Sequence, residues 1–182
     1  MDFGDFILAV GNAVAASLLL NSGIAKTVAA GPPRRAVEEI VPVLDGAVIG
    51  AALRAAAIVE IAVAAALPVP LLRLPAAIVV SLLGASFGVL GLLGIARHSK
   101  APCGCFGTSG RRPLGWFNVA LGLALAAVYP INAAWSAGER YPVATLLLTS
   151  IMSIALCVYM RRELVIRLLM PRRGGPAESE AH

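Results

Sequence analysis

The sequence predicts an all-α, polytopic membrane protein, and two observations carry that prediction. Hydrophobic residues make up 59% of the 182 residues and charged residues 14%, whereas a soluble domain has about 45–50% apolar and about 25% charged residues. The apolar residues also fall in long blocks, several of them near the ~20 residues that a membrane-spanning helix needs. We therefore expect a helix bundle in the lipid bilayer, with a four-helix core and a fifth, C-terminal span.

The expected spans follow from the apolar blocks and from the breaks between them. The first covers about residues 6–29 and ends at Ala-Gly-Pro-Pro-Arg-Arg (30–35), because two adjacent prolines interrupt a helix. A mildly amphipathic stretch, 36–46, is suited to the membrane interface. The remaining spans are expected at about 47–67, 74–96, 114–134 and 143–160.

The two ends of the chain differ from this pattern. The N-terminus lacks the basic residues of a secretory signal peptide, so we expect the first helix to be retained. The bundle then occupies residues 1–163. The tail, 164–182, is basic and then rich in Gly and Pro, which is typical of a partly disordered segment.

Basic residues gather on one side of this arrangement. Five spans place residues 31–46, the loop near 97–113 and the C-terminal tail on one face, which holds most of the Lys and Arg. The positive-inside rule places that face in the cytoplasm and the N-terminus outside, and we expect the plasma membrane. The Ala- and Arg-rich composition of the chain suggests a GC-rich bacterium. The same rule accounts for the net charge of +5, so no nucleic-acid partner is implied.

The most polar segment, residues 96–118, holds two of the three cysteines. Cys103 and Cys105 flank Gly104, whose small size lets the two sulfur atoms approach. A disulfide across so short a ring would be strained and easily reduced, which favours exchange over a structural role and makes the pair the candidate catalytic residues. Basic neighbours favour the thiolate, which is the nucleophile in exchange. These neighbours are Arg97, His98, Lys100, Arg111 and Arg112.

A metal site is the competing interpretation of the same segment. His98, Cys103 and Cys105 offer one nitrogen and two sulfur ligands. Zinc normally takes four ligands with C-x2-C spacing, whereas copper(I) accepts two thiolates and fewer partners. A loop without chemistry of its own is the third possibility. The remaining cysteine, Cys157, is expected to be either a small apolar residue of the last helix or a relay thiol within reach of the loop.

Ionisable residues in or near the apolar spans need partners there. Lys26 and Arg54 are close enough to helix ends for their side chains to reach the interface. Glu60 lies deeper, and a hydrogen bond to the first helix would lock the bundle; the alternative is a proton acceptor that serves thiol chemistry. Asn118, at the start of its span, can tie that helix to a neighbour.

Together these pieces resemble the methylamine utilisation protein MauE family, a relative of the DoxX-like four-helix membrane proteins. The matching pieces are Ser22-Gly23-Ile24-Ala25-Lys26, Glu60, Cys103-Gly104-Cys105-Phe106-Gly107 and Phe117-Asn118, within about residues 5–135. The resemblance implies an accessory role in maturation or transport of the disulfide-rich small subunit of methylamine dehydrogenase. It also implies a thioredoxin-like partner, with Cys103 and Cys105 as the exchange pair.

The function expected is therefore thiol–disulfide exchange at the membrane during maturation of a partner protein. Two alternatives stay open. One is a non-enzymatic assembly or transport partner whose loop docks a disulfide-containing client, and the other is a copper carrier that uses His98, Cys103 and Cys105. The charge rule places the cysteine pair in the cytoplasm, whereas disulfide formation needs an oxidising compartment. The residues indicate no particular cofactor.

Overall fold

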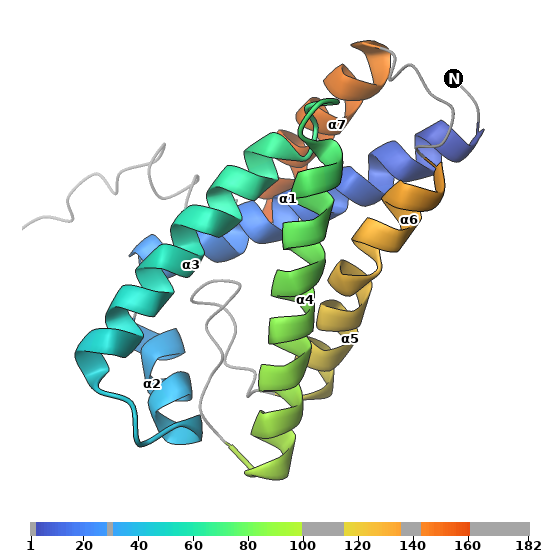
Figure 1. The fold of residues 1–182 in the computed structure, drawn as a ribbon. Coiled ribbons are helices and arrows are strands. Elements are labelled where there is room, and N and C mark those ends of the chain that lie inside the picture. The colour runs from blue at the N-terminus through green and yellow to red at the C-terminus, as the bar shows by residue number, and fades with distance from the viewer. Residues whose placement is uncertain (1–2, 29–30, 100–114, 136–142, 161–182) are drawn as a thin grey trace, which may run out of the picture.

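The computed structural model describes residues 3–28, 31–99, 115–135 and 143–160, and in these ranges the chain forms helices and turns but no strand. The helices are α1 (Phe3–Val28), α2 (Gly31–Ile40), α3 (Gly46–Ala66), α4 (Arg73–Ala96), α5 (Trp116–Ala126), α6 (Val128–Trp135) and α7 (Val143–Met160). Figure 1 shows α1 lying across α3 and α4, with α5 and α6 beside α4. The predicted all-α fold is confirmed.

Four helical segments of the described chain are long and apolar enough to cross a membrane. They are Phe6–Val28, Gly46–Ala66, Arg73–Ala96 and Trp116–Ala134, and their bounds agree closely with the first four predicted spans. At 1.5 Å per residue, α3 is about 30 Å long, which is the thickness of the hydrocarbon core. The protein is thus a multi-pass membrane protein. In α7 the part of the apolar stretch that the structure describes is Leu147–Tyr159, and a fifth crossing stays a prediction.

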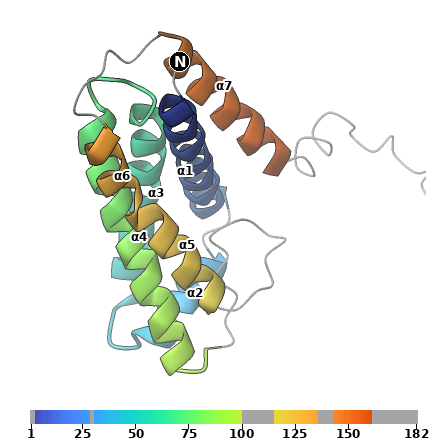
Figure 2. The ribbon, with the colours of Figure 1, turned by 90° about the vertical axis from the view of Figure 1, so that its right-hand side faces the viewer.

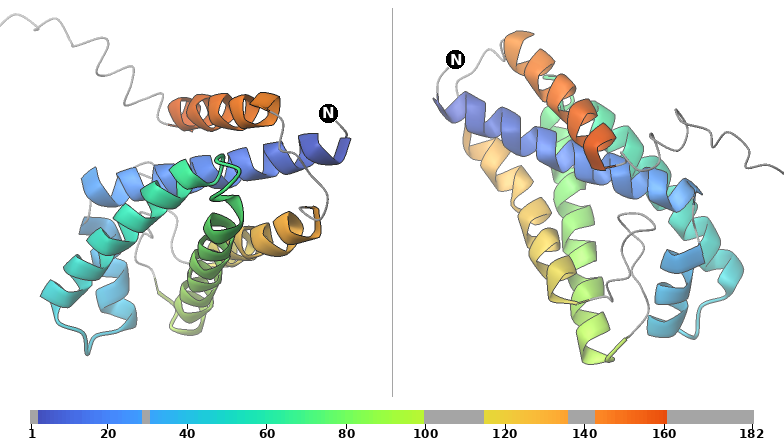
Figure 3. Two further views of the ribbon diagram at one scale, coloured as in Figure 1. Left: turned by 45° about the horizontal axis from the view of Figure 1, so that its top comes forward. Right: turned by 180° about the vertical axis from the view of Figure 1, so that it is seen from behind.

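The buried core consists mainly of small and branched apolar residues from α1, α3, α4 and the α5–α6 segment. Lipid tails are as apolar as leucine, so helices in a bilayer associate by close packing, which small residues permit. Figure 2 and Figure 3 show α7 outside this core, lying along α1. The core residues are Ala15, Ala16, Leu19, Val63, Ala64, Leu67, Ala76, Ala77, Val80, Leu125 and Val128.

The backbones of α4 and α5 touch along a line of glycines. A Cβ atom added at Gly122 would lie 2.5 Å from the backbone nitrogen of Gly88 and 2.7 Å from the carbonyl oxygen of Gly84. Farther along, one added at Gly91 would lie 3.0 Å from the backbone nitrogen of Val119. Contacts that advance along α4 while they recede along α5 make the two helices antiparallel. The end of α4 and the start of α5 therefore lie at the same end of the bundle.

The prolines after α1 begin a helix, where the sequence predicted only a break. Pro32 and Pro33 occupy the first turn of α2, where a missing N–H costs nothing because that turn has no intrahelical acceptor for it. The helix therefore covers Gly31–Ile40, earlier than the amphipathic stretch predicted at 36–46. Its buried residues Ala36 and Ile40 pack against Leu90 of α4. This contact holds α2 at the end of the bundle where α4 ends.

The predicted span 114–134 is divided into α5 and α6, which the sequence analysis missed. Pro130 cannot donate the helical bond to Ala126, and the helix is interrupted at Ala127. Ser81 of α4 covers the interruption: its Oγ accepts a bond from the backbone N–H of Tyr129 at 2.9 Å and donates to the carbonyl of Leu125 at 3.5 Å. A side chain of the neighbouring helix thus satisfies the backbone where the proline breaks the ladder.

Candidate functional site

A buried ionic cluster joins α1, α3 and α4. The Lys26 ammonium group pairs with Oε1 of Glu60, and it donates a hydrogen bond to Ser22 Oγ at 2.8 Å. The same nitrogen lies 5.0 Å from the centre of the Phe87 ring, within the range of a cation–π contact. Lys26 is 5% exposed and Glu60 is 1% exposed, so lipid and water reach neither.

Gly23 explains how two charged residues fit between packed helices. A Cβ atom at this position would lie 2.7 Å from Ile61 Cγ1 and 3.0 Å from the carbonyl oxygen of Ala57. Only glycine lets α1 approach α3 this closely, and the approach brings Ser22 and Lys26 to Glu60. Within the stretch Ser22–Lys26, the glycine therefore permits the close contact between α1 and α3, and the polar residues on either side of it lie at the Glu60 carboxylate.

The structure decides between the roles considered for Lys26. Its side chain points inward to Glu60, and the expectation that it reaches the membrane interface is wrong, because the carboxylate offers a partner inside the bundle. The expected link between Glu60 and the first helix is confirmed. The second carboxylate oxygen, Oε2, is buried and has no hydrogen-bond partner among the described residues. A proton-accepting role for Glu60 stays a prediction.

Asn118 contacts α4 at Gly91, about one turn nearer to the end of α4 than Phe87. Its side chain is buried, and the glycine at position 91 leaves room for it, since a Cβ there would lie 3.2 Å from Asn118 Cβ. The amide nitrogen Nδ2 has no hydrogen-bond partner within the described ranges. A hydrogen-bonded tie to a neighbouring helix is therefore not seen, and the contact of Asn118 with α4 is made by packing.

His98 ends α4 in an unusual conformation. Its φ is 48°, and its N–H bonds to the carbonyl of Ile95 at 3.1 Å while that of Ser99 reaches Gly94 at 2.9 Å. This pair of bonds is a Schellman motif, whose left-handed residue is usually glycine. Arg97 adds a bond to the carbonyl of Ile40 at the end of α2. The chain therefore leaves α4 in a fixed direction.

We expect His98→Gly to stabilise the protein by about 1 kcal/mol, because glycine adopts a positive φ without the steric cost borne by other residues. The measurement is thermal unfolding of purified protein in detergent. His98→Ala is the control: it loses the imidazole ring but keeps the steric cost of a positive φ, so it should not be stabilised. A lower stability for the glycine variant would mean that the imidazole makes a contact worth more than the backbone cost.

Cys103 and Cys105 lie in residues 100–114, outside the described residues, so the exchange pair stays a prediction. The structure does define the two attachments of this segment. Ser99 follows α4 and Gly115 precedes α5, and the antiparallel packing of those helices sets both at one end of the bundle. Of the alternative metal ligands only His98 is described, and the described part of the chain contains no group of three His, Cys, Asp or Glu suited to a metal ion.

Cys157 is half-buried in α7, which lies along α1. Ser153 Oγ donates to the carbonyl of Ala13 at 3.3 Å. Figure 3 shows α7 running in the same direction as α1, so Cys157, one turn later, is level with about Ser17. Eleven further residues of α1 reach Val28, which is about 16 Å along the helix axis. Cys157 thus lies near the middle of the bundle, which favours the small apolar residue over the relay thiol.

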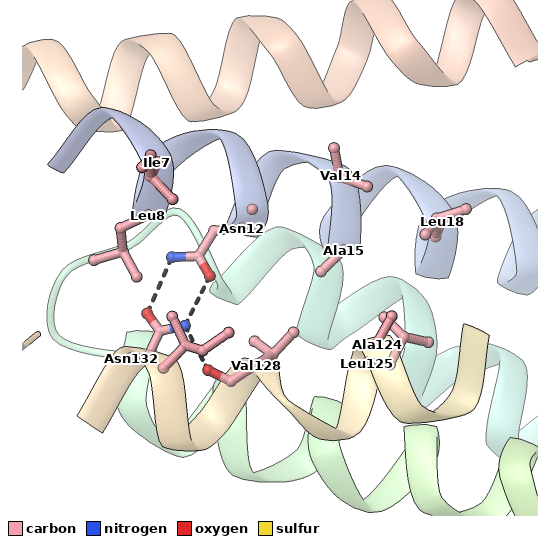
Figure 4. Close-up of a pocket in the computed structure, with 12 residues that line it drawn as sticks. Ile7, Leu8, Asn12, Val14, Ala15, Leu18, Ala124, Leu125, Val128 and Asn132 are labelled. Carbon is pink, nitrogen blue, oxygen red and sulfur yellow. Dashed lines mark hydrogen bonds between the residues drawn. The ribbon is translucent and has the colours of Figure 1, made fainter. Parts of the chain in front are cut away.

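One polar contact inside the bundle was missed by sequence reasoning. Asn12 of α1 and Asn132 of α6 exchange two amide hydrogen bonds, of 3.0 and 2.8 Å, and Asn132 also donates to the carbonyl of Val128 at 2.9 Å. Figure 4 shows the pair at one end of an apolar groove of about 310 Å³ between α1 and α5–α6. The signal was present, because an asparagine inside an apolar span needs a partner.

Comparison with known proteins gives one result. The family model described as methylamine utilisation protein MauE matches residues 4–137. This range contains α1 to α6 and the segment with the two cysteines. No curated protein and no solved structure matches the chain.

Proposed function

Since this chain belongs to the methylamine utilisation protein MauE family, we propose that it is an accessory membrane protein whose Cys103 and Cys105 exchange thiols and disulfides during maturation of a partner protein. The residues of the family resemblance fall on positions with distinct structural tasks. Ser22, Lys26 and Glu60 join helices in the interior, whereas the two cysteines belong to the segment attached between the end of α4 and the start of α5.

The observation that carries the proposal is the anchoring of this segment. Its attachments are fixed at one end of the bundle by the glycine contacts of α4 and α5 and by the Schellman motif at His98. A dithiol that serves a protein partner must be presented outside the lipid, and a segment whose two attachments lie together at one end of a bundle suits that requirement. Polar and basic residues near its start, Arg97 and His98, favour a thiolate there.

The proposed exchange conserves electrons. A Cys103 thiolate attacks a disulfide of the partner, forms a mixed disulfide and releases one partner thiolate. Cys105 then attacks the Cys103 sulfur, which closes the Cys103–Cys105 disulfide and releases the second partner thiolate. Two electrons pass to the partner, and the reverse sequence transfers a disulfide to a client. A strained ring favours this second direction.

The partner and setting are proposed from the family. The client is a disulfide-containing protein, in the family the small subunit of methylamine dehydrogenase, and a thioredoxin-like protein exchanges electrons with the pair. The membrane is the plasma membrane. A role in methylamine utilisation is supported by membership of the family alone and needs no particular cysteine chemistry.

Cysteine variants test the exchange. We expect Cys105→Ser to accumulate a mixed disulfide with a partner, seen as a larger band on a non-reducing gel that dithiothreitol removes, because the resolving thiol is lost. Cys103→Ser should give no such band, and Cys157→Ser, in α7, should behave as wild type. The double variant Cys103→Ser, Cys105→Ser should lose client maturation. Full maturation in the double variant would favour the non-enzymatic assembly partner instead.

Labelling with a membrane-impermeant maleimide in a Cys157→Ala background locates the pair. Labelling of intact cells only after reduction indicates an external, oxidised pair, as disulfide transfer to a secreted client requires. Labelling only after lysis indicates a cytoplasmic dithiol. Equal copper content in the wild type and in the double cysteine variant would contradict the metal-carrier alternative.

A further inference from the structure

One face of α3 carries a glycine with open space around it. Gly46, Gly50 and Arg54 are spaced by four residues, so they lie along the same side of the helix. A Cβ atom added at Gly50 would meet nothing within 4 Å. The neighbouring turns differ, because a side chain at Gly46 would collide with the guanidinium group of Arg34, which reaches over from α2.

Two guanidinium groups frame this open glycine. That of Arg34 lies at Gly46, and its Nε bonds to Glu38 Oε1 at 2.7 Å. The Nε of Arg54 donates to the carbonyl of Gly50 at 3.3 Å. The two groups are therefore about one helical turn apart along the helix, a rise of about 5–6 Å. Figure 1 shows α2 beside the first turns of α3.

The charge of Arg54 is not compensated by the described chain. Arg54 is exposed, and no acidic side chain in the described ranges pairs with it. Of the carboxylates of α2 and of the turn before α3, Glu38 is paired with Arg34, Asp45 caps α3 by accepting a bond from the N–H of Ala47 at 3.1 Å, and Glu39 is exposed and pairs with neither arginine. An arginine facing lipid without a partner is costly. Among the described residues, the guanidinium group of Arg54 is therefore available to an anion.

The depth of Arg54 indicates where that anion comes from. Arg54 is eight residues into α3, about 12 Å along its axis, and helical side chains lean toward the N-terminus. Its guanidinium group thus reaches back toward the membrane surface, to the level of Gly50. One turn deeper on the same face, Ile58 is 66% exposed. The face is consequently basic near the surface and apolar below, which is the order of groups in a phospholipid.

We propose that Arg34, Gly46, Gly50 and Arg54 bind an anionic phospholipid, with its phosphate between the two guanidinium groups and an acyl chain along Ile58. Arginine is suited to phosphate because its planar donors match two oxygen atoms at once. Gly50 supplies the space that the headgroup occupies. The proposal involves none of the residues of the cysteine segment and does not depend on the proposed exchange.

The test uses the full-length protein in neutral detergent, titrated with phosphatidylglycerol or phosphatidylcholine and followed by native mass spectrometry and thermal unfolding. We expect phosphatidylglycerol to bind better and to raise the unfolding midpoint more. Arg54→Gln and Arg34→Gln should each weaken phosphatidylglycerol binding about fivefold, which is the effect of one basic residue near a lipid surface. Gly50→Leu should weaken it as well, because the new side chain fills the gap.

Arg35→Gln is the matched control, because Arg35 is a neighbouring exposed arginine of α2 that does not flank Gly50. It should leave the preference for phosphatidylglycerol unchanged, and all variants should unfold like wild type in phosphatidylcholine. Equal binding of phosphatidylglycerol by wild type and Arg54→Gln would overturn the proposal. The proposal would also be overturned if free glycerol 3-phosphate raised the unfolding midpoint of the wild type as much as phosphatidylglycerol does. That result would identify a site for soluble phosphate instead of a lipid.

Discussion

Lys26→Met should lower the free energy of unfolding by about 3–5 kcal/mol, since it leaves the Glu60 carboxylate buried without its cation. Glu60 is 1% exposed, and its Oε2 already lacks a partner among the described residues. Removal of Lys26 would leave Oε1 with at most the Ser22 hydroxyl. Thermal or denaturant unfolding in detergent measures the loss.

The double variant Lys26→Met, Glu60→Leu is the informative companion. Replacing a buried ion pair by apolar residues of similar volume is often neutral or stabilising, so it should recover most of the stability lost in the single variant. Arg34→Met, which breaks an exposed pair with Glu38, is the control and should cost less than about 1 kcal/mol. If the single and the double variant lost the same free energy of unfolding, Lys26 would stabilise the protein by something other than its ion pair with Glu60.

This comparison also separates a structural role from a functional one. If the pair only locks α1 to α3, the double variant should regain client maturation together with its stability. If Glu60 serves as a proton acceptor for thiol chemistry, the double variant should be stable and yet remain impaired. Glu60→Gln, which keeps the shape and removes the charge, should then show the same impairment.

Gly122→Leu should separate α4 from α5 and destabilise the protein by about 3 kcal/mol or more, because backbone atoms cannot move aside as a flexible side chain can. A Cβ atom alone would lie 2.5 Å from Gly88 nitrogen. Thermal unfolding in detergent measures the cost. We also expect loss of client maturation, since α4 and α5 hold both attachments of residues 100–114.

Gly88→Ala is the matched control, one helix away. Gly88 itself forms the wall against which the Gly122 side chain would collide, yet a Cβ added at Gly88 would point into open space. Its stability should differ from wild type by less than about 1 kcal/mol. A large loss at Gly88, or none at Gly122, would contradict the backbone contact between the two helices.

The sequence predicted the fold class and the first four spans because apolar blocks of membrane length have few other structures available. The predicted helix boundaries were wrong near the prolines. Pro32 and Pro33 interrupt one helix and begin another, and Pro130 divides a span without ending it. In both places, whether the helix ends or continues depends on the residues packed beside the proline, such as Ser81, which accepts a bond from the N–H of Tyr129. The sequence alone does not reveal those neighbours.

The interior polar residues were predicted in kind but not in pairing. Glu60 was expected to bond to the first helix. That Lys26 pairs with it, instead of reaching the membrane interface, depends on Gly23, which lets α1 and α3 approach. The pair Asn12–Asn132 joins residues 120 positions apart, and no local pattern links them. Local spacing identifies groups that need partners, whereas three-dimensional packing selects the partners.

The division of the fourth span at Ala127 has a mechanical consequence for how this span fits a bilayer thinner or thicker than itself. A continuous helix that is too long or too short for its bilayer must tilt as a whole or distort the lipid around it. The interruption at Ala127 lets α5 and α6 take different tilts: the glycine contacts hold α5 to α4, whereas the Asn12–Asn132 hydrogen bonds hold α6 to α1. We therefore expect α6 and α1 to adjust together to a mismatched bilayer, at the end of the bundle opposite to the attachments of residues 100–114.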